Sequence, residues 1–261
     1  MSKPTDLLQV SKLCKEFGGV AALHNVSFEV MRGEVFAIIG PNGAGKTTLF
    51  NLISGALPAT AGDVYFKGRR LNHLSPDQIA AQGIARTFQT VQTFGQLTVL
   101  ENVMVGRHLK LNYSLWHAAL RLPRARAEEQ RVRADALAYL EMVGLSERAN
   151  DSAAALSFGQ QRILEVARAL AVEPELILLD EPGAGLTRSE VAELDRLIQQ
   201  LRERGITILL VEHNMELVMG IADRVIVLDY GRKIAEGTPL QVQHNEQVIA
   251  AYLGEEKFTA V

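Results

Sequence analysis

Uninterrupted apolar runs occur at residues 35–39, 176–179 and 208–211, each too short for an ordinary helix. The first reads "VFAIIG" and ends in glycine, as expected of a strand buried on both faces of a parallel sheet. Residues with helical spacing follow it: Leu49, Leu52, Ile53 and Ala56. Another helical pattern, "SEVAELDRLIQQLRERG", lies before the third run and closes on glycine. Strands that alternate with helices predict an α/β fold with a mainly parallel sheet.

Two segments depart from this alternation. Residues 7 to 35 have the pattern of short alternating strands with a turn at "MRGE", which predicts an N-terminal antiparallel β subdomain. From about Thr98 to Val143 the pattern is helical and no strand signal interrupts it. We therefore expect a core formed by residues 1–97 and 172–261, with an inserted α-helical subdomain at about 98–171.

Composition narrows the class of protein. Of the 261 residues, 48% are hydrophobic and 22% charged, which is typical of a globular protein. The net charge of -3 disfavours nucleic acid as a partner, because proteins that bind a duplex usually carry a basic excess. The single cysteine, Cys14, cannot form an internal disulfide and is interpreted as a small packed hydrophobe. No apolar run approaches the ~18 residues that cross a bilayer, so we expect a soluble chain that reaches a membrane only through a partner.

A basic run is also present, but it has two interpretations. It consists of Arg121, Arg124, Arg126, Arg131 and Arg133 and is interrupted by Glu128 and Glu129. A solvated helix face is the more common explanation of such a pattern. The alternative is a contact with a membrane or a partner.

The glycine-rich segment "GPNGAGKT" has the form G-x-x-x-x-G-K-[ST], with a predicted strand before it and a helix after it. Such a loop can turn its backbone N–H groups toward phosphates, aided by the partial positive charge of the helix N-terminus. Lys46 is expected to reach the β- and γ-phosphates, and the hydroxyl of Thr47 to bind Mg²⁺. The residues predicted to hold the nucleotide here are Gly40, Pro41, Asn42, Gly43, Ala44, Gly45, Lys46, Thr47 and Thr48.

Two acidic residues end the predicted strand in "LILLDEP". Ligands of open α/β sheets bind at the carboxyl edge of the strands, where Asp180 is expected to lie. A carboxylate suits Mg²⁺, here through a water molecule. Glu181 is then placed to act as the general base that polarises the attacking water.

His213 and Gln89 are weaker candidates for the same site. His213 ends the strand "ITILLVEH" and is expected at the same sheet edge, where it could bond the γ-phosphate. A lone histidine at a strand end is otherwise more often structural. Gln89, in "RTFQT", follows a predicted edge strand and could bind Mg²⁺ or the water.

The segment "ALSFGQQR" combines a hydroxyl, a glycine and an amide at the start of a helical pattern. Ser157, Gly159 and Gln160 suit an anion held at a helix N-terminus. Phe158 does not fit such a clamp. A phenylalanine is strained at positive φ, so we expect ordinary backbone geometry at residue 158 and a ring directed away from the phosphate.

The order of these motifs over nearly the whole chain resembles the ATPase subunits of ATP-binding-cassette transporters. The resemblance implies a single cassette domain over 1–261, with a P-loop NTPase core that uses ATP and Mg²⁺. It also implies a head-to-tail dimer, in which Ser157, Gly159 and Gln160 close over the nucleotide of the second subunit. Phe17, in "CKEFGGVAAL", stands where that family stacks a ring on adenine, although a lone aromatic residue is more often part of a core.

Two positions depart from that family's pattern. Phe158 replaces the first glycine of its usual L-S-G-G-Q signature, and Thr187 stands where an aspartate is common. No catalytic role is therefore assigned to Thr187.

Within the family, the aromatic signature, "GIARTFQ", "EPGAGL" and the terminal "VIAAYLGE" resemble the ATPases of branched-chain amino acid importers. That branch implies two permease subunits, an indirect link to a solute-binding protein, and a place on the cytoplasmic face of the inner or plasma membrane. ATPases of urea or short-amide importers and of lipopolysaccharide exporters are the alternatives. A cassette ATPase acting on ribosomes or DNA is more remote, as is a P-loop kinase or GTPase, which would lack the signature and the histidine.

Overall fold

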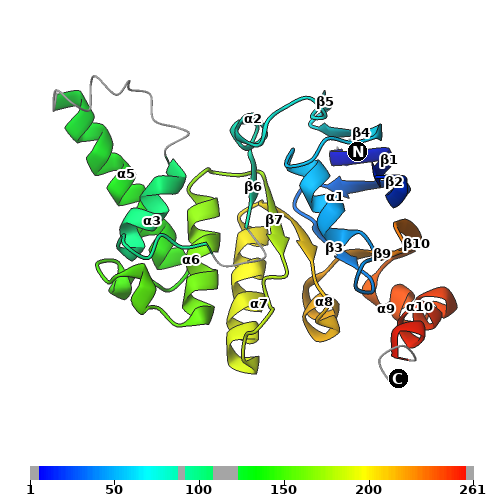
Figure 1. Cartoon of the computed structure of the whole chain (residues 1–261). Helices are drawn as coiled ribbons and strands as arrows, with labels where there is room; N and C mark the ends of the chain where they lie inside the picture. Colours follow the sequence, from blue (N-terminus) through cyan, green and yellow to red (C-terminus); the bar gives the residue numbers. More distant parts are fainter. Residues whose placement is uncertain (1–5, 88–91, 108–122, 257–261) are drawn as a thin grey trace, which may run out of the picture.

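The computed structural model describes residues 6–87, 92–107 and 123–256, and Figure 1 shows the arrangement of its elements. The strands are β1 (Asp6–Phe17), β2 (Val20–Met31), β3 (Val35–Ile39), β4 (Ala61–Phe66), β5 (Arg69–Arg70), β6 (Ile84–Arg86), β7 (Leu176–Asp180), β8 (Thr207–Val211), β9 (Arg224–Asp229) and β10 (Arg232–Gly237). The α-helices are α1 (Lys46–Ile53), α2 (Pro76–Ala81), α3 (Val99–Gly106), α5 (Pro123–Met142), α6 (Phe158–Leu170), α7 (Arg188–Glu203), α8 (Met215–Ile221), α9 (Pro239–Gln243) and α10 (Glu246–Glu256).

The core sheet has the strand order β10-β9-β3-β8-β7-β6. All neighbours in it are parallel except β10 and β9, which confirms the mainly parallel sheet expected from the sequence. Every residue of β3, β7 and β8 is buried. Helices cover both faces of these strands, which explains why the strands read as continuous apolar runs.

The two faces of the core sheet carry different helices. On one face, α1 contributes Leu49, Phe50 and Ile53 to a core that also includes residues of the N-terminal strands. On the other face, α6, α7 and α8 pack against alternate residues of the same strands, through Val166, Leu194 and Val218 among others. The helices that follow the two glycine-bearing motifs, α1 and α6, therefore lie on opposite faces of the sheet.

The N-terminal strands form a separate antiparallel sheet of order β2-β1-β4-β5, as expected. The expectation of short strands was wrong, because β1 and β2 each have 12 residues. Register shifts interrupt their pairing, and Lys12 and Asn25 have φ of 47° and 56°. Each shift resets the alternation of apolar and polar residues along a strand, so that one long strand has the pattern of several short ones.

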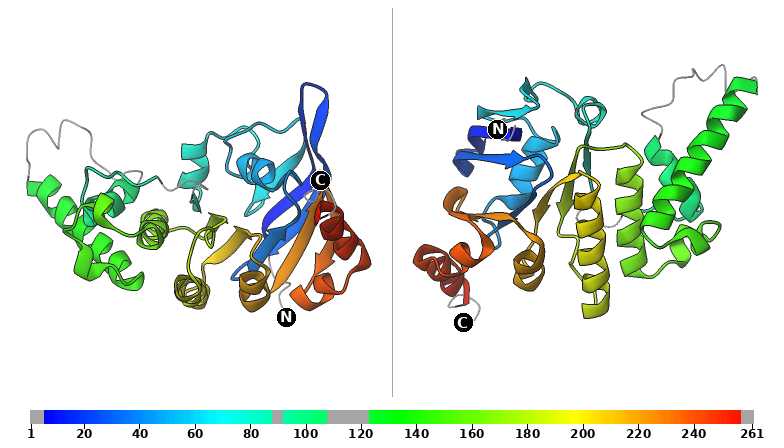
Figure 2. Two further views of the ribbon diagram at one scale, coloured as in Figure 1. Left: turned by 60° about the horizontal axis from the view of Figure 1, so that its bottom comes forward. Right: turned by 180° about the vertical axis from the view of Figure 1, so that it is seen from behind.

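Helices α3, α5 and α6 form a group at one end of the molecule, on the opposite side from the antiparallel sheet (Figures 1 and 2). This group has its own buried cluster, which includes Val103, Leu140 and Leu164. The division of the chain at residues 98 and 171 remains a proposal, which this separate cluster supports. Within the described residues, no helix is both long enough and apolar enough to span a bilayer.

Arg131 and Arg133 of the basic run lie exposed on α5, as expected of a solvated helix face. Arg121 of the same run lies outside the described residues. The helix itself begins at Pro123.

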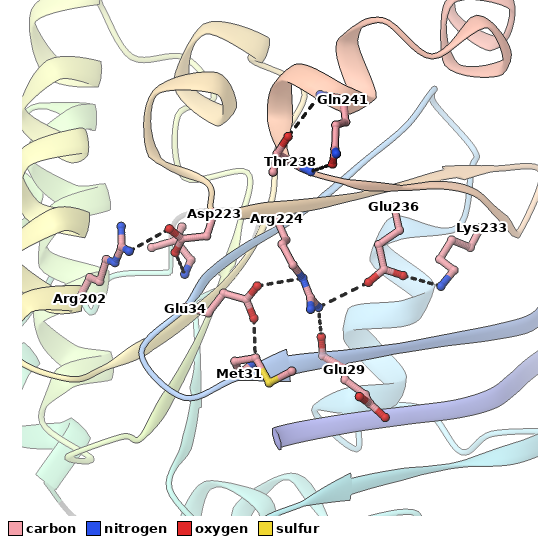
Figure 3. Close-up of polar contacts among 11 residues, drawn as sticks. Glu29, Met31, Glu34, Arg202, Asp223, Arg224, Lys233, Glu236, Thr238 and Gln241 are labelled. Carbon is pink, nitrogen blue, oxygen red and sulfur yellow. Dashed lines mark hydrogen bonds and ion pairs between the residues drawn. The ribbon is translucent and has the colours of Figure 1, made fainter. Parts of the chain in front are cut away.

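A polar network around Arg224 joins the antiparallel sheet to the core sheet (Figure 3). From β9, the Nε atom of Arg224 lies 3.0 Å from Oε1 of Glu34, and the guanidinium also donates to the carbonyl oxygen of Glu29 on β2. Glu34 is buried and accepts a hydrogen bond of 2.7 Å from the backbone N–H of Met31. Burial raises the pKa of Glu34, while the Met31 bond and the Arg224 charge oppose that change. The network fixes the subdomain that carries Phe17 to the strands that carry the glycine-rich loop.

We predict that Arg224→Met lowers the free energy of unfolding by roughly 3 kcal/mol, because it leaves the Glu34 carboxylate buried without its cation. Urea unfolding followed by circular dichroism measures this loss. The control is Arg70→Met, which removes an ion pair with Asp63 in which the two side chains are 49% and 32% exposed, and it should cost less than about 1 kcal/mol. Equal losses for the two variants would contradict the role assigned to Arg224.

Candidate functional site

The glycine-rich loop connects β3 to α1, and its two fixed glycines are required by space. Gly40 has φ of 148°, and a Cβ atom there would lie 2.1 Å from the carbonyl oxygen of Leu228. Gly45 has φ of 100°, and a Cβ atom there would lie 2.7 Å from the carbonyl oxygen of Ala22. Larger side chains would push the loop away from the strands behind it, so the backbone can take this path only with glycine.

Lys46 begins α1 and folds back over this loop. Its Nζ atom donates to the carbonyl oxygens of Gly40 and Pro41, at 2.6 and 2.9 Å. The side chain is buried, whereas Asn42, Gly43 and Thr47 are exposed. The first turn of α1 contains no acidic residue, so no carboxylate opposes the attraction of this helix N-terminus for an anion.

Asp180 and Glu181 lie at the carboxyl end of β7, as predicted. Asp180 is fully buried, with Oδ2 at 2.9 Å from the guanidinium of Arg86, and its Oδ1 has no hydrogen-bond partner among the described residues. Burial raises the pKa of Asp180, and Arg86 opposes that change. Glu181 has φ of 48°, and its backbone N–H donates to the carbonyl oxygen of Val211 at 2.9 Å. A non-glycine residue in this strained region is more common at functional sites than elsewhere.

His213 lies beside Glu181, which confirms that both are at the same sheet edge. The pairing of β7 with β8 sets Asp180 opposite Val211, two residues before His213. The Nδ1 atom of His213 is 3.9 Å from Oε2 of Glu181. The histidine side chain is 59% exposed, so it can contact a ligand bound in front of the strands.

Arg86 was not identified from the sequence. It ends β6, the edge strand next to β7, and bonds Asn51 and Ser54 of the α1 segment as well as Asp180. Its signal was present in "GIARTFQ", but only the glutamine of that segment was assigned a role. Gln89 itself lies outside the described residues, and its proposed contact with Mg²⁺ or water stays a prediction.

Phe17 ends β1 with a ring that is 47% exposed. The Nζ atom of Lys15, on the same strand, lies 4.9 Å from the centroid of this ring. A half-exposed ring is available for stacking, and it is not part of the core. The stacking of adenine on Phe17 remains a prediction.

Ser157 and Gln160 form a capping box at the start of α6. The Gln160 backbone N–H donates to Ser157 Oγ at 3.2 Å, and the Ser157 backbone N–H donates to Gln160 Oε1 at 3.0 Å. A capping box fixes the entry of the chain into the helix. The same two side chains that the sequence assigns to an anion thus also define where α6 begins.

Phe158 is the first residue of α6, so the expectation of ordinary backbone geometry is confirmed. Its ring lies against the loop that follows Glu181, because a Cβ atom on Gly185 would be 3.0 Å from the ring. Arg162 contacts the same ring, with its guanidinium carbon 5.3 Å from the centroid. The phenylalanine therefore packs on its own chain and joins α6 to this loop.

Gly159 faces α7. A Cβ atom there would lie 2.2 Å from Oε1 of Glu190, whose other oxygen accepts from both the backbone N–H and the hydroxyl of Thr187 at 2.8 Å. These bonds lower the pKa of Glu190. Thr187 thus acts as the N-cap of α7, which agrees with the absence of a catalytic assignment. A larger residue at position 159 would displace the Glu190 side chain.

Some of these residues can hold a metal ion together with a nucleotide. The buried Oδ1 of Asp180 and the exposed hydroxyl of Thr47 are hard oxygen donors, which is the type that Mg²⁺ prefers. The described residues contain no group of three or more His, Cys, Asp or Glu that could hold a metal by itself. A magnesium ion bound mainly by phosphate oxygens needs only one or two protein ligands, so the donors present fit it.

Comparison with known proteins gives the same assignment over the whole chain. A family model described as ABC transporter matches residues 23–184, and one described as branched-chain amino acid ATP-binding cassette transporter matches residues 232–257. The high-affinity branched-chain amino acid transport ATP-binding protein LivG of Salmonella typhimurium is 46% identical over 256 residues, covering 98% of this chain and 100% of the relative.

Solved structures agree in fold. The ADP conformation of an ATP-binding cassette of an ABC transporter has a TM-score of 0.84 and 35% identity, covering 96% of this chain and 99% of that one. A dimeric post-hydrolysis state of another cassette, bound to ADP and Pi, has a TM-score of 0.75 and 29% identity, covering 89% and 98%. With a glycine-rich loop built for phosphates, two carboxylates and a histidine at one sheet edge, and these relatives along its full length, the chain belongs to the ABC transporter family, as one of its nucleotide-binding, ATP-hydrolysing cassettes.

Proposed function

We propose that this chain is the ATPase subunit of an importer for branched-chain amino acids. The observation that carries the proposal is the meeting of the phosphate loop, Asp180–Glu181 and His213 at one edge of the core sheet. The solute is proposed from the LivG relatives, which match the chain from end to end, and from the C-terminal family match. ATPases of urea or short-amide importers and of lipopolysaccharide exporters are tested against it below.

In this proposal each residue of the site has one task. Backbone N–H groups of residues 42–48 and the Lys46 ammonium hold the phosphates of ATP, and Phe17 stacks on adenine. Glu181 takes a proton from the attacking water, and the nearby His213 bonds the γ-phosphate. Thr47, Asp180 and Gln89 would hold Mg²⁺, directly or through water, and the ion would neutralise charge on the phosphate oxygens.

The signature residues serve a second subunit. Helix α6 packs on the face of the core sheet opposite to α1, so Ser157, Gly159 and Gln160 are on a different side from their own phosphate loop. A head-to-tail dimer, with a second copy of this chain or a related subunit, brings them to the partner's nucleotide. The dimeric cassette bound to ADP and Pi supports such a pairing.

Two permease subunits complete the proposed transporter, and a solute-binding protein delivers the amino acid to them. The chain would then act at the cytoplasmic face of the inner or plasma membrane as a peripheral subunit. ATP binding closes the two cassettes, and hydrolysis removes the γ-phosphates that join them. The resulting motion is passed to the permeases.

Glu181→Gln should reduce ATP hydrolysis at least ~10²-fold, because a positioned general base contributes 10²–10⁴. It should still bind ATP and should accumulate as an ATP-bound dimer, since the γ-phosphates are no longer removed. Phosphate release measures the rate, and size-exclusion chromatography with and without ATP measures the dimer. A variant that hydrolyses ATP at the original rate would contradict the role of Glu181.

In the Glu181→Gln background, Ser157→Arg should abolish the ATP-dependent dimer and leave ATP binding by the monomer intact, because α6 and the chain's own phosphate loop lie on different faces of the sheet. The matched control is Ser146→Arg, an equal change at an exposed position of the helical subdomain. If Ser157→Arg dimerises with ATP as well as the control does, Ser157 does not close over a second nucleotide.

The solute is tested with the complete transporter in lipid vesicles. We expect accumulation of leucine, isoleucine or valine that requires ATP on the side of this subunit and is lost in a Glu181→Gln complex. Fluorescence or isotope counting of the vesicle contents measures uptake. Accumulation of urea instead, or outward movement of a lipid, would show that one of the alternative solutes is correct.

A further inference from the structure

Glu212 is a fully buried acidic side chain between the end of β8 and His213. The sequence "VEHN" places it beside the histidine, but nothing in the proposed chemistry requires a carboxylate there. Burying a charged group costs free energy unless hydrogen bonds compensate it. The contacts of Glu212 therefore bear on why a glutamate occupies this position.

Its two oxygens bind backbone N–H groups from two different loops. Oε1 accepts from the N–H of Gly183 at 2.6 Å. Oε2 accepts from the N–H groups of His213 and Asn214 at 3.1 and 3.2 Å. One carboxylate thus connects the loop after Glu181 to the loop that carries His213.

The loop after Glu181 has a glycine at the point where it contacts this carboxylate. A Cβ atom on Gly183 would lie 2.9 Å from Oε1 of Glu212, so a larger residue would press on the bond. Gly183 is two residues beyond Glu181, and the Ala184 N–H donates back to the Glu181 carbonyl oxygen at 3.1 Å. Displacement of Gly183 would therefore move the turn that holds Glu181.

The chemistry of the site favours a carboxylate over an amide. All three groups that face Glu212 are donors, and an ionised carboxylate is purely an acceptor. In the part of the chain that the structure describes, no lysine or arginine pairs with Glu212, so these charge-assisted bonds balance its burial. A glutamine would turn an NH₂ group toward at least one N–H.

We infer that Glu212 is a positioning residue for hydrolysis, which holds the Glu181 carboxylate at a fixed place relative to His213. It binds neither ATP nor water and acts through the two loops. The inference rests on the proposed roles of Glu181 and His213. In this inference Glu212 sets the separation of Glu181 and His213, which is 3.9 Å between Glu181 Oε2 and His213 Nδ1.

The test uses Glu212→Asp, which shortens the side chain by one methylene. Aspartate can still accept from the N–H groups one and two residues ahead, as in common Asx turns, but it cannot reach Gly183. We expect kcat for ATP to fall roughly 10- to 100-fold, as for a catalytic group displaced by about 1 Å. The KM for ATP should change little, because the phosphate loop is untouched.

Glu216→Asp is the matched control, since it makes the same change at an exposed position of α8, and it should leave kcat unchanged. Gly183→Ala changes the donor side of the same contact and should also lower kcat. It provides a second test if Glu212→Asp proves unstable. Because both changes affect one hydrogen bond, their effects on kcat should not add in the double variant.

The outcomes separate this inference from the proposed function. If kcat of both Glu212→Asp and Gly183→Ala stays within twofold of the original while Glu181→Gln is inactive, Glu212 does not position the base and the inference is wrong. If Glu181→Gln itself keeps full activity, the assignment of the base fails first. If kcat falls and KM rises by the same factor, and both variants also have a lower melting temperature, the role of Glu212 is structural only.

Discussion

The parallel pairing of β3, β8 and β7 is the constraint on which the rest of the site depends. The register sets Ile38, Val211 and Asp180 in one row across the sheet. Each strand therefore delivers its next residues to the same edge: the phosphate loop, His213 and Glu181. The strands are buried on both faces, and a shift in register by one residue would turn every side chain of a strand to the opposite face of the sheet. Packing of the core thus fixes the chemistry at its edge.

A second consequence follows from the two covered faces of this sheet. The helix that begins in the phosphate loop is on one face, and the helix that begins at Ser157 is on the other. Within its own chain, the signature instead contacts the loop after Glu181, through Phe158 on Gly185, and the start of α7, through Gly159 on Glu190. The phenylalanine that departs from the family pattern is part of this internal contact. In the proposed dimer, each nucleotide would therefore contact the signature of the partner subunit, and that signature is packed against the Glu181 loop of its own chain.

Much of the fold could be predicted from the sequence because its signals are local. Apolar runs, the glycine-rich loop and the carboxylates that end a buried strand all depend on neighbouring residues, and parallel pairing then places the strand ends together. The proximity of His213 to Glu181 followed from this reasoning. The long β1 and β2 did not, since bulges disrupt the alternation on which strand prediction relies.

Contacts between distant side chains were not accessible in the same way. Arg86 meets Asp180, 94 residues away, and Glu212 meets Gly183 through a loop whose path depends on tertiary packing. The Arg224 network requires two sheets to be placed before its partners are known. In each case a buried charge is satisfied by groups remote in the sequence, and no periodicity marks such a pair.

The central claim is that two chains share each nucleotide. A structure of the Glu181→Gln variant with ATP and Mg²⁺ tests it most directly. The account predicts two chains head to tail, with Ser157 Oγ and the Gly159 N–H within hydrogen-bond distance of a γ-phosphate held by the other chain's Lys46. A γ-phosphate contacted by residues of a single chain, with Ser157 and Gly159 remote from any nucleotide, would contradict it.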